Sequence, residues 1–357
     1  MRILVISDIH FGVTESSINN ENIRKLLINC IKDNLPINRI ILLGDIFDLD
    51  LARFGDALDG NDNSIIGFRQ FITELIGNGV QADKWTYIPG NHDYDLFDIP
   101  ARNEGMKRRF SKKSGDKIIY WPPQTWEGWN IAPNVFKNTI EVQYPHRWEQ
   151  INGKYILLTH GHYFDPSQTF GYKIEKVNKK DGIPIEKFFT RSAQYQGLAR
   201  LVSYQGRSIL VVGGLYRTGE LMKSFFKKVI KYGSIGLYRG KPLNKHLKNA
   251  AAAYVSCFGP LGRPKTGPVV PDALIFGHTH EEGISYVNKE TAMKYGIEKG
   301  FTLVNDGGFI RGSGGSKIVG SFAVIEAKKE KCCIKLFVLK TDDSSGPKAD
   351  MVQQCVI

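Results

Sequence analysis

The sequence lacks the features of a secreted or membrane-spanning protein. Its five cysteines show no CxxC or paired spacing, which argues against a disulfide framework and a cysteine-rich zinc site. No window approaches the roughly 18 apolar residues that a membrane-spanning helix needs. The apolar stretch after Met1 is too short for a signal peptide and stops at Asp8. We therefore expect a cytoplasmic protein of a reducing compartment.

Acidic residues are scarce in one part of the chain. Residues 161–270 contain 19 Lys and Arg but only 5 Asp and Glu, whereas the remainder contains 29 against 31. The whole net charge of +12 therefore arises in this segment. Basic charge confined to a segment usually faces an anionic partner, such as a nucleic acid, a phospholipid surface or a phosphorylated substrate. A well-solvated surface is the simpler alternative.

Apolar runs of strand length are abundant in the 357 residues, and each ends in a turn that holds Gly, Asp, Asn or His. They are residues 2–10, 39–48, 84–93, 154–162 and 273–280. Fully apolar runs are typical of strands that are buried on both faces. Segments with helical periodicity, 18–34 and 64–79, separate the first three runs. This alternation predicts a layered α/β fold, and the strand-like pieces after His280 are expected to complete a second sheet.

Residues 165–270 interrupt this alternation. Their clearest element is an amphipathic helix over 218–233, with apolar residues on one face and lysines on the other. We expect a basic helical insertion over 165–270 that forms a lid-like subdomain, although an ordinary surface helix would show the same pattern. Residues 1–164 and 271–345 would then form the core, and the polar residues 346–357 a flexible C-terminal tail.

Six of the eight histidines lie in the turns that follow the predicted strands: His10, His92, His160, His162, His278 and His280. The carboxyl ends of strands in an open α/β sheet share one edge, so we expect these side chains to meet there with Asp8, Asp45 and Asn91. Carboxylate and amide oxygens mixed with imidazole nitrogens, without thiolates, suit Mn, Fe or Zn. The number of candidate ligands fits two divalent ions better than one.

Five motifs then follow in order: Asp8-Ile9-His10, Gly44-Asp45-Ile46-Phe47-Asp48, Gly90-Asn91-His92-Asp93, His160-Gly161-His162 and Gly277-His278-Thr279-His280. Together they resemble the signature of the calcineurin-like metallophosphoesterases. The resemblance implies an α/β fold in which a β-sandwich is flanked by helices and carries two metal ions at the sheet edge.

The resemblance also implies a role for each residue. One ion would be held by Asp8, His10 and His280, the other by Asn91, His160 and His278, and Asp45 would bridge them. His92 would be the catalytic acid beside the leaving oxygen, with Asp93 as its orienting partner. His162 and Asp48 would lie behind the ligands or contact the substrate.

A pair of divalent cations activates water and stabilises the charge of an in-line displacement at phosphorus. We therefore expect a metal-dependent phosphoesterase or pyrophosphatase, with manganese as the ion and iron or zinc as alternatives. An insertion between His160 and His278 resembles that of the UDP-diacylglucosamine pyrophosphatases. It implies a phosphodiester or pyrophosphate substrate presented by a membrane, and peripheral binding of residues 165–270 to the anionic inner face of that membrane. The alternatives are a nuclease or nucleotide phosphodiesterase, which would bind nucleic acid, and a non-catalytic scaffold.

Overall fold

The computed structural model describes the chain in several separate ranges. The described residues are 1–13, 15–48, 63–94, 96, 124–129, 140–169, 171–177, 182, 184–185, 187–189, 191–192, 245–265, 267, 270–310, 318–342 and 346–357. The predicted amphipathic helix over 218–233 lies outside these residues, so it stays a prediction. Among the described residues, no helix has both the length and the apolar character needed to cross a membrane.

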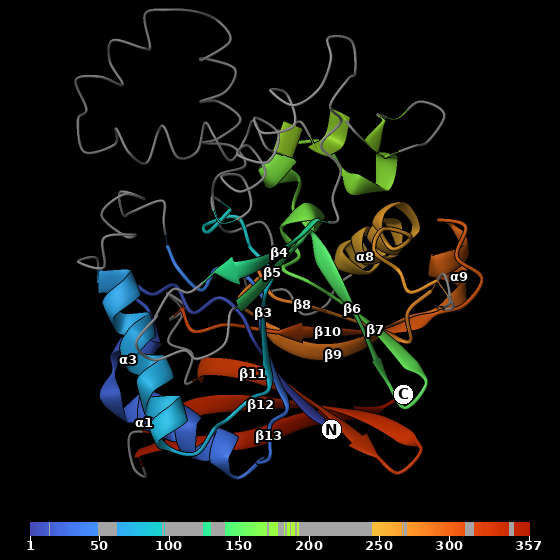
Figure 1. Ribbon diagram of the computed structural model, residues 1–357. Coiled ribbons are helices and arrows are strands. Elements are labelled where there is room, and N and C mark those ends of the chain that lie inside the picture. The colour runs from blue at the N-terminus through green and yellow to red at the C-terminus, as the bar shows by residue number, and fades with distance from the viewer. Residues whose placement is uncertain are drawn as a thin grey trace, which may run out of the picture.

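Two β-sheets pack face to face at the centre of the molecule (Figure 1). The larger sheet has the strand order β13-β12-β11-β1-β2-β3-β5-β4, and the smaller has the order β6-β7-β8-β10-β9. The strands of the larger sheet are β1 (Arg2–Ile6), β2 (Arg39–Leu42), β3 (Lys84–Tyr87), β4 (Gln124–Trp129), β5 (Ile140–Tyr144), β11 (Ile318–Lys328), β12 (Lys331–Asp342) and β13 (Gly346–Val356). Those of the smaller sheet are β6 (His146–Ile151), β7 (Lys154–Thr159), β8 (Ala273–Phe276), β9 (Glu282–Val287) and β10 (Phe301–Asp306).

The continuous apolar runs form strands that are covered on both faces, as predicted. In β1, Ile3 and Val5 point into the cluster between the two sheets. Leu4 and Ile6 point the other way, into the cluster under the helices. Strands β1, β2 and β3 run parallel in register, and β7 and β8 are also parallel. The carboxyl ends of these strands therefore come together on one side of the sandwich.

Helices cover the outer face of each sheet, which gives four layers. Helices α1 (Glu21–Lys32) and α3 (Asn63–Gly77) pack on the larger sheet, and the side chain of Asn20 caps α1 by accepting from the N–H groups of Asn22 and Ile23. Helices α8 (Lys245–Phe258) and α9 (Lys289–Met293) pack on the smaller sheet. Short 3-10 helices connect these elements: η1 (Ser17–Asn19), η2 (His162–Phe164), η3 (Pro166–Thr169) and η4 (Ile174–Lys176). The α/β sandwich flanked by helices is the fold that the sequence predicts.

Two expectations about the end of the chain are wrong. Residues 346–357 are not a flexible tail: they form β13, which pairs antiparallel with β12 and closes one edge of the larger sheet. Of the three strand-like pieces after His280, only β10 joins the smaller sheet, whereas β11 and β12 extend the larger sheet beside β1. A polar sequence can form a strand because backbone pairing does not depend on side-chain polarity.

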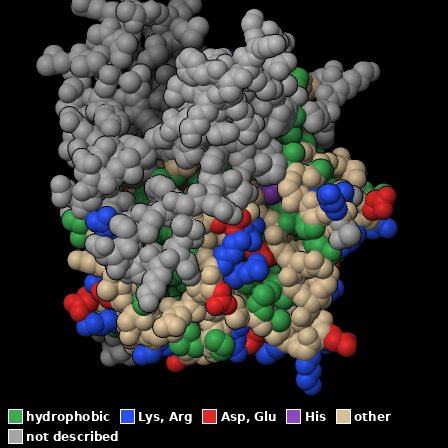
Figure 2. Space-filling view, in the orientation of Figure 1, with side chains coloured by type: hydrophobic (Ala, Val, Ile, Leu, Met, Phe, Trp, Pro, Cys, Tyr) green, Lys and Arg blue, Asp and Glu red, His purple; other side chains and the backbone are tan. Residues whose placement is uncertain are grey.

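The predicted insertion is described only in part. Its C-terminal portion includes α8, whose Ala250, Ala253 and Tyr254 are buried in the same cluster as Leu157 of β7 and Leu274 of β8. This helix therefore packs directly on the core sheet. Figure 2 shows Lys, Arg, Asp and Glu side chains interspersed on the visible described surface, rather than a single basic patch. The lid-like subdomain and its boundaries stay a prediction.

Candidate metal centre

The turns that follow β1, β2, β3, β7 and β8 converge between the carboxyl ends of the two sheets. Backbone hydrogen bonds tie these turns together. The N–H groups of Asp8 and His10 donate to the carbonyls of Gly44 and Asp45, both at 2.9 Å. The N–H of Gly277 donates to the carbonyl of His160 at 3.0 Å. Side chains far apart in the sequence are therefore held at one point.

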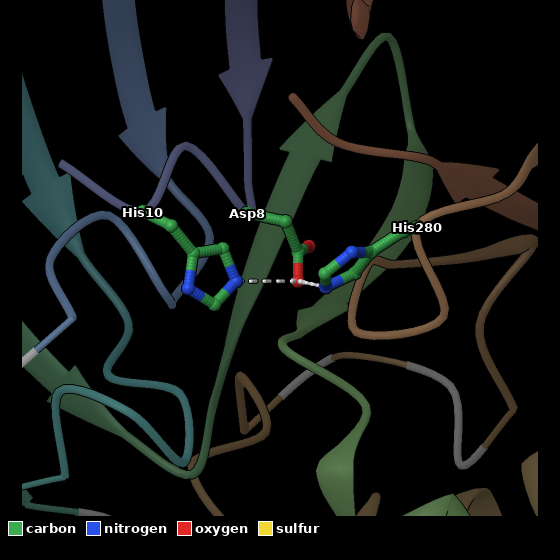
Figure 3. A group of neighbouring side chains, drawn as sticks. All are labelled: Asp8, His10 and His280. Atoms are coloured by element: carbon green, nitrogen blue, oxygen red, sulfur yellow. Dashed lines mark ion pairs between the residues drawn. The ribbon is translucent and has the colours of Figure 1, made fainter. Parts of the chain in front are cut away.

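Asp8, His10 and His280 form the first group that could hold a metal ion. The carboxylate of Asp8 lies between the two imidazoles (Figure 3). Its Oδ1 is 4.0 Å from Nε2 of His10 and 3.4 Å from Nε2 of His280. The other oxygen, Oδ2, accepts a hydrogen bond from the backbone N–H of His278 at 2.8 Å, which fixes the carboxylate.

Asp45, His160 and His278 form the second such group, and His10, Asp48 and His92 are a third set of neighbouring donors. Nε2 of His160 lies 3.1 Å from Oδ2 of Asp45 and 3.3 Å from Oδ1 of Asn91. Nδ1 of His160 is 2.9 Å from the carbonyl oxygen of Leu43, so this nitrogen carries the proton and Nε2 faces the other candidate ligands. The amide oxygen of Asn91 therefore belongs to the same cluster.

Asp45 connects the two groups. Its Oδ2 lies 3.8 Å from Nε2 of His10 and 3.1 Å from Nε2 of His160, so one oxygen faces both sets of donors. Its Oδ1 accepts a hydrogen bond from the backbone N–H of His92 at 2.8 Å. All seven residues predicted as metal ligands thus lie close together, with Asp45 between the two groups.

Most of these residues have unusual backbone geometry. Asp8, His10, Asp45, His278 and His280 all have positive φ angles, between 50° and 69°. Asp, Asn and His are the non-glycine residues that adopt this region most readily, yet the conformation still costs roughly 1 kcal/mol or more at each position. Such a concentration of left-handed residues is typical of functional sites.

Gly44 allows the second group to form. It has a φ of +85°, and a Cβ atom placed on it would lie 2.6 Å from the ring of His160. Any larger residue would therefore push the imidazole away from Asp45. The glycine of the Gly44-Asp45 motif is required by close packing as well as by backbone conformation.

Neighbouring opposite charges shift the pKa values of the residues in the centre. Burial alone would raise the pKa of Asp45, but His160 and His92 hold that pKa well below its usual range. Burial alone would lower the pKa of His160, but Asp45 and Asp8 raise it to about 10. The carboxylates are therefore ionised, and without a cation a proton on His160 provides the compensating charge.

Several buried polar atoms in the centre have no hydrogen-bond partner among the described residues. They include Oδ1 of Asp8, Nε2 of His10 and Nδ1 of His280. Buried polar atoms are rarely left unpaired, because each costs roughly 1–3 kcal/mol. Oxygen and nitrogen donors converging on two points fit a pair of divalent cations, so the residues present suit the predicted ions.

His92 lies beside this cluster, but its orienting partner is not the one expected. Oδ2 of Asp48 is 3.3 Å from Nδ1 of His92 and also 3.3 Å from Nδ1 of His10. Asp93 was predicted to orient His92, but its carboxylate accepts hydrogen bonds from the N–H groups of Gly90 and Ile46 and from the hydroxyl of Tyr87. Asp93 therefore stabilises the loop, and Asp48 positions the imidazole.

His162 and Asp165 lie just behind the second group. His162 is fully buried, its Nε2 is 3.3 Å from the hydroxyl of Tyr144, and it belongs to none of the candidate ion groups. Asp165 is not among the predicted site residues, but its Oδ2 is 3.6 Å from Nε2 of His278. The sequence contains one indication of its role: Asp165 lies five residues after His160, in a turn that already contains two candidate residues.

A family model described as calcineurin-like phosphoesterase matches residues 1–282. No curated protein matches the chain.

Solved structures similar to this chain include three with low identity. Vps29 of Entamoeba histolytica complexed with zinc is 12% identical over 99% of this chain and 98% of its own, with a TM-score of 0.34. Vps29 of Chaetomium thermophilum is 9% identical over 100% and 96%, with a TM-score of 0.36. A dimetal phosphatase of Danio rerio is 11% identical over 100% and 98%, with a TM-score of 0.38. Scores of this size support no argument about function.

Proposed function

The chain belongs to the calcineurin-like phosphoesterase family, and on this basis we propose that it is a dinuclear metal-dependent phosphohydrolase that cleaves a phosphodiester or pyrophosphate bond. The observation that carries the proposal is the position of Asp45. One of its oxygens lies within 3.8 Å of a donor nitrogen from each candidate group. A single carboxylate between two donor sets suits two neighbouring cations.

Each group would hold one divalent ion: Asp8, His10 and His280 on one side, and Asn91, His160 and His278 on the other. When bound, such ions supply an activated water and neutralise charge on the phosphoryl group. The protein keeps the donors fixed through the backbone bonds between the turns, so little reorganisation is needed during the reaction.

His92 is the candidate general acid. Oδ2 of Asp48 lies 3.3 Å from Nδ1 of His92 and positions the ring, and the imidazole would donate a proton to the leaving oxygen. About a third of the His92 side chain is exposed, whereas His10 and His160 are almost fully buried. A partly exposed imidazole at the rim of the buried candidate centre is well placed to contact a substrate.

A hydrolysis panel tests the proposal. Protein loaded with Mn²⁺ should hydrolyse bis-p-nitrophenyl phosphate or a UDP-linked lipid, and a chelator should abolish that hydrolysis. A phosphomonoester and single-stranded DNA complete the panel. Cleavage of the DNA alone would favour the nuclease alternative. Failure to hydrolyse any phosphoester, with two ions bound, would favour the scaffold.

The manganese preference, the lipid substrate and the membrane contact are finer parts of this proposal. They are supported by the position of the insertion in the sequence and by its excess of Lys and Arg. Binding to vesicles that contain anionic lipid should weaken as salt rises, because salt screens the basic side chains. Vesicle binding that does not respond to salt would contradict the membrane part and leave the hydrolase part intact.

A further inference from the structure

Asp165 lies next to the candidate metal centre but is not a member of either donor group. Its Oδ2 is 3.6 Å from Nε2 of His278. This separation is slightly longer than a hydrogen bond, and no other acid of the described residues is paired with His278. Asp165 therefore contacts a single ring nitrogen, Nε2, of one candidate ligand, His278.

The turn that carries Asp165 is tightly built. Gly161 has a φ of 100°, and the N–H of Phe164 donates to its carbonyl at 2.8 Å. Tyr163 and Phe164 are buried in the cluster under α8. The N–H of Asp165 itself donates to the carbonyl of His162 at 3.2 Å. These contacts fix the turn, and the turn places Asp165 beside His278.

The two carboxylate oxygens of Asp165 have different partners. Oδ1 accepts a hydrogen bond from the backbone N–H of Ser167 at 2.8 Å. This bond fixes the plane of the carboxylate and leaves Oδ2 facing His278. The backbone of His278 is fixed separately, because its N–H donates to Oδ2 of Asp8. What remains to be set is the orientation and the tautomer of the imidazole ring.

We propose that Asp165 is a positioning residue whose carboxylate favours the proton of His278 on Nε2 and so leaves Nδ1 of the ring to bind the cation. A neutral imidazole has one donor and one acceptor nitrogen, so fixing the proton on Nε2 makes Nδ1 the ligand. Histidine ligands commonly donate their second nitrogen to a carboxylate in this way. The inference rests on the proposed function, because it requires a cation in the second group.

Replacing Asp165 by Asn gives a sharp test. The amide oxygen can keep the bond from Ser167 N–H, and the NH₂ group then faces Nε2 of His278. An NH₂ group donates, so the proton of the ring would move to Nδ1 and block the ligand atom. Asp165→Asn should therefore weaken the binding of one of two Mn²⁺ ions about 10- to 100-fold and leave the other unchanged. Asp165→Ala also loses the hydrogen bond from the N–H of Ser167, but it should weaken Mn²⁺ binding no more than Asp165→Asn does.

The measurement is a Mn²⁺ titration of the full-length, chelator-treated protein, followed by electron paramagnetic resonance of the free ion. Asp350→Asn, at a surface ion pair with Lys340, is the matched control and should bind like the wild type. Equal binding by Asp165→Asn and the wild type would overturn the inference. A mild Asn variant beside a severe Ala variant would overturn it too, because that order indicates a role in the turn alone. A wild type that binds no Mn²⁺ would overturn the proposed function itself.

A second readout addresses the tautomer directly. In ¹⁵N-labelled protein loaded with Zn²⁺, the wild type should show Nδ1 of His278 as the ligating nitrogen and the proton on Nε2. A ligating Nε2 would contradict the inference even if metal affinity changed.

Discussion

Oδ2 of Asp45 lies 3.1 Å from Nε2 of His160, although 115 residues separate them in the sequence and they follow strands of different sheets, β2 and β7. The same oxygen faces His10 from the larger sheet. The candidate metal centre is therefore a junction between the two layers of the sandwich, and Asp45 is its central residue.

Replacing Asp45 by Asn should remove most of the activity. Loss of the bridging charge forfeits several kcal/mol of transition-state stabilisation, which corresponds to a roughly thousandfold lower kcat/KM. Metal content after dialysis should fall below two ions per chain. Asp33→Asn, at the exposed C-terminal end of α1, is a suitable control. An Asp45→Asn variant with full activity would contradict the bridging role.

His92→Asn should reveal the role of the candidate acid through the leaving group. General acid catalysis is worth roughly 10²- to 10⁴-fold when the leaving alkoxide needs a proton. A p-nitrophenolate leaves without one, so its release should slow much less. Steady-state kinetics on an alkyl and a p-nitrophenyl diester would measure the difference. Equal losses on both substrates would indicate that His92 acts in binding instead.

Asp48→Asn should change kcat in the same direction as His92→Asn but less strongly. The carboxylate faces Nδ1 of both His92 and His10, and these imidazoles hold the pKa of Asp48 below its usual range against the effect of burial. Without the carboxylate of Asp48, the imidazole of His92 should be held less firmly in its orientation. Asp93→Asn is the informative comparison: because Asp93 supports the loop, its loss should lower the melting temperature more than Asp48→Asn does.

Cation binding should release a proton near neutral pH. In the cation-free protein the pKa of His160 is raised to about 10, so the ring is protonated at pH 8. A cation must displace that proton. Below pH 10, the apparent affinity of the protein for the cation should therefore increase about tenfold for each unit by which the pH rises. Calorimetric titrations in two buffers of different ionisation enthalpy count the proton. Identical heats in both buffers would contradict this expectation.

The protein should lose stability in mild acid through His146. Its Nε2 is 2.7 Å from the carbonyl of Leu261 and must donate, and its Nδ1 is 2.9 Å from the hydroxyl of Tyr254 and accepts. Burial lowers the pKa of His146 to about 4, against 6.5 in the unfolded chain. The unfolded state therefore binds the proton first, and stability is lost as the pH falls from 6.5 towards 4. The loss is about 3 kcal/mol. His146→Gln should flatten this part of the denaturation curve, and an unchanged slope would contradict the assignment.

The sequence predicted the strands and the centre because both depend on local signals. Runs such as 2–6 and 273–276 are apolar on both faces, and each is followed directly by the residues that converge. The pairing of Asp48 with His92 could not be predicted in this way, because neighbours in sequence suggested Asp93. The direction of a side chain within a tight turn decides such a contact. Strand β13 was missed because its stability comes from the backbone of β12 rather than from an apolar pattern of its own.

The left-handed backbone at five of the candidate ligands restricts which residues those positions can accept. Alanine or leucine would keep the conformational cost and lose the donor atom, whereas glycine would lower the cost. In a descendant of this chain without the proposed activity, glycine is therefore the replacement that would lower the conformational cost at positions 8, 10, 45, 278 and 280. Substitutions of that kind would leave a more heat-resistant protein that lacks the donor atoms of the candidate metal centre.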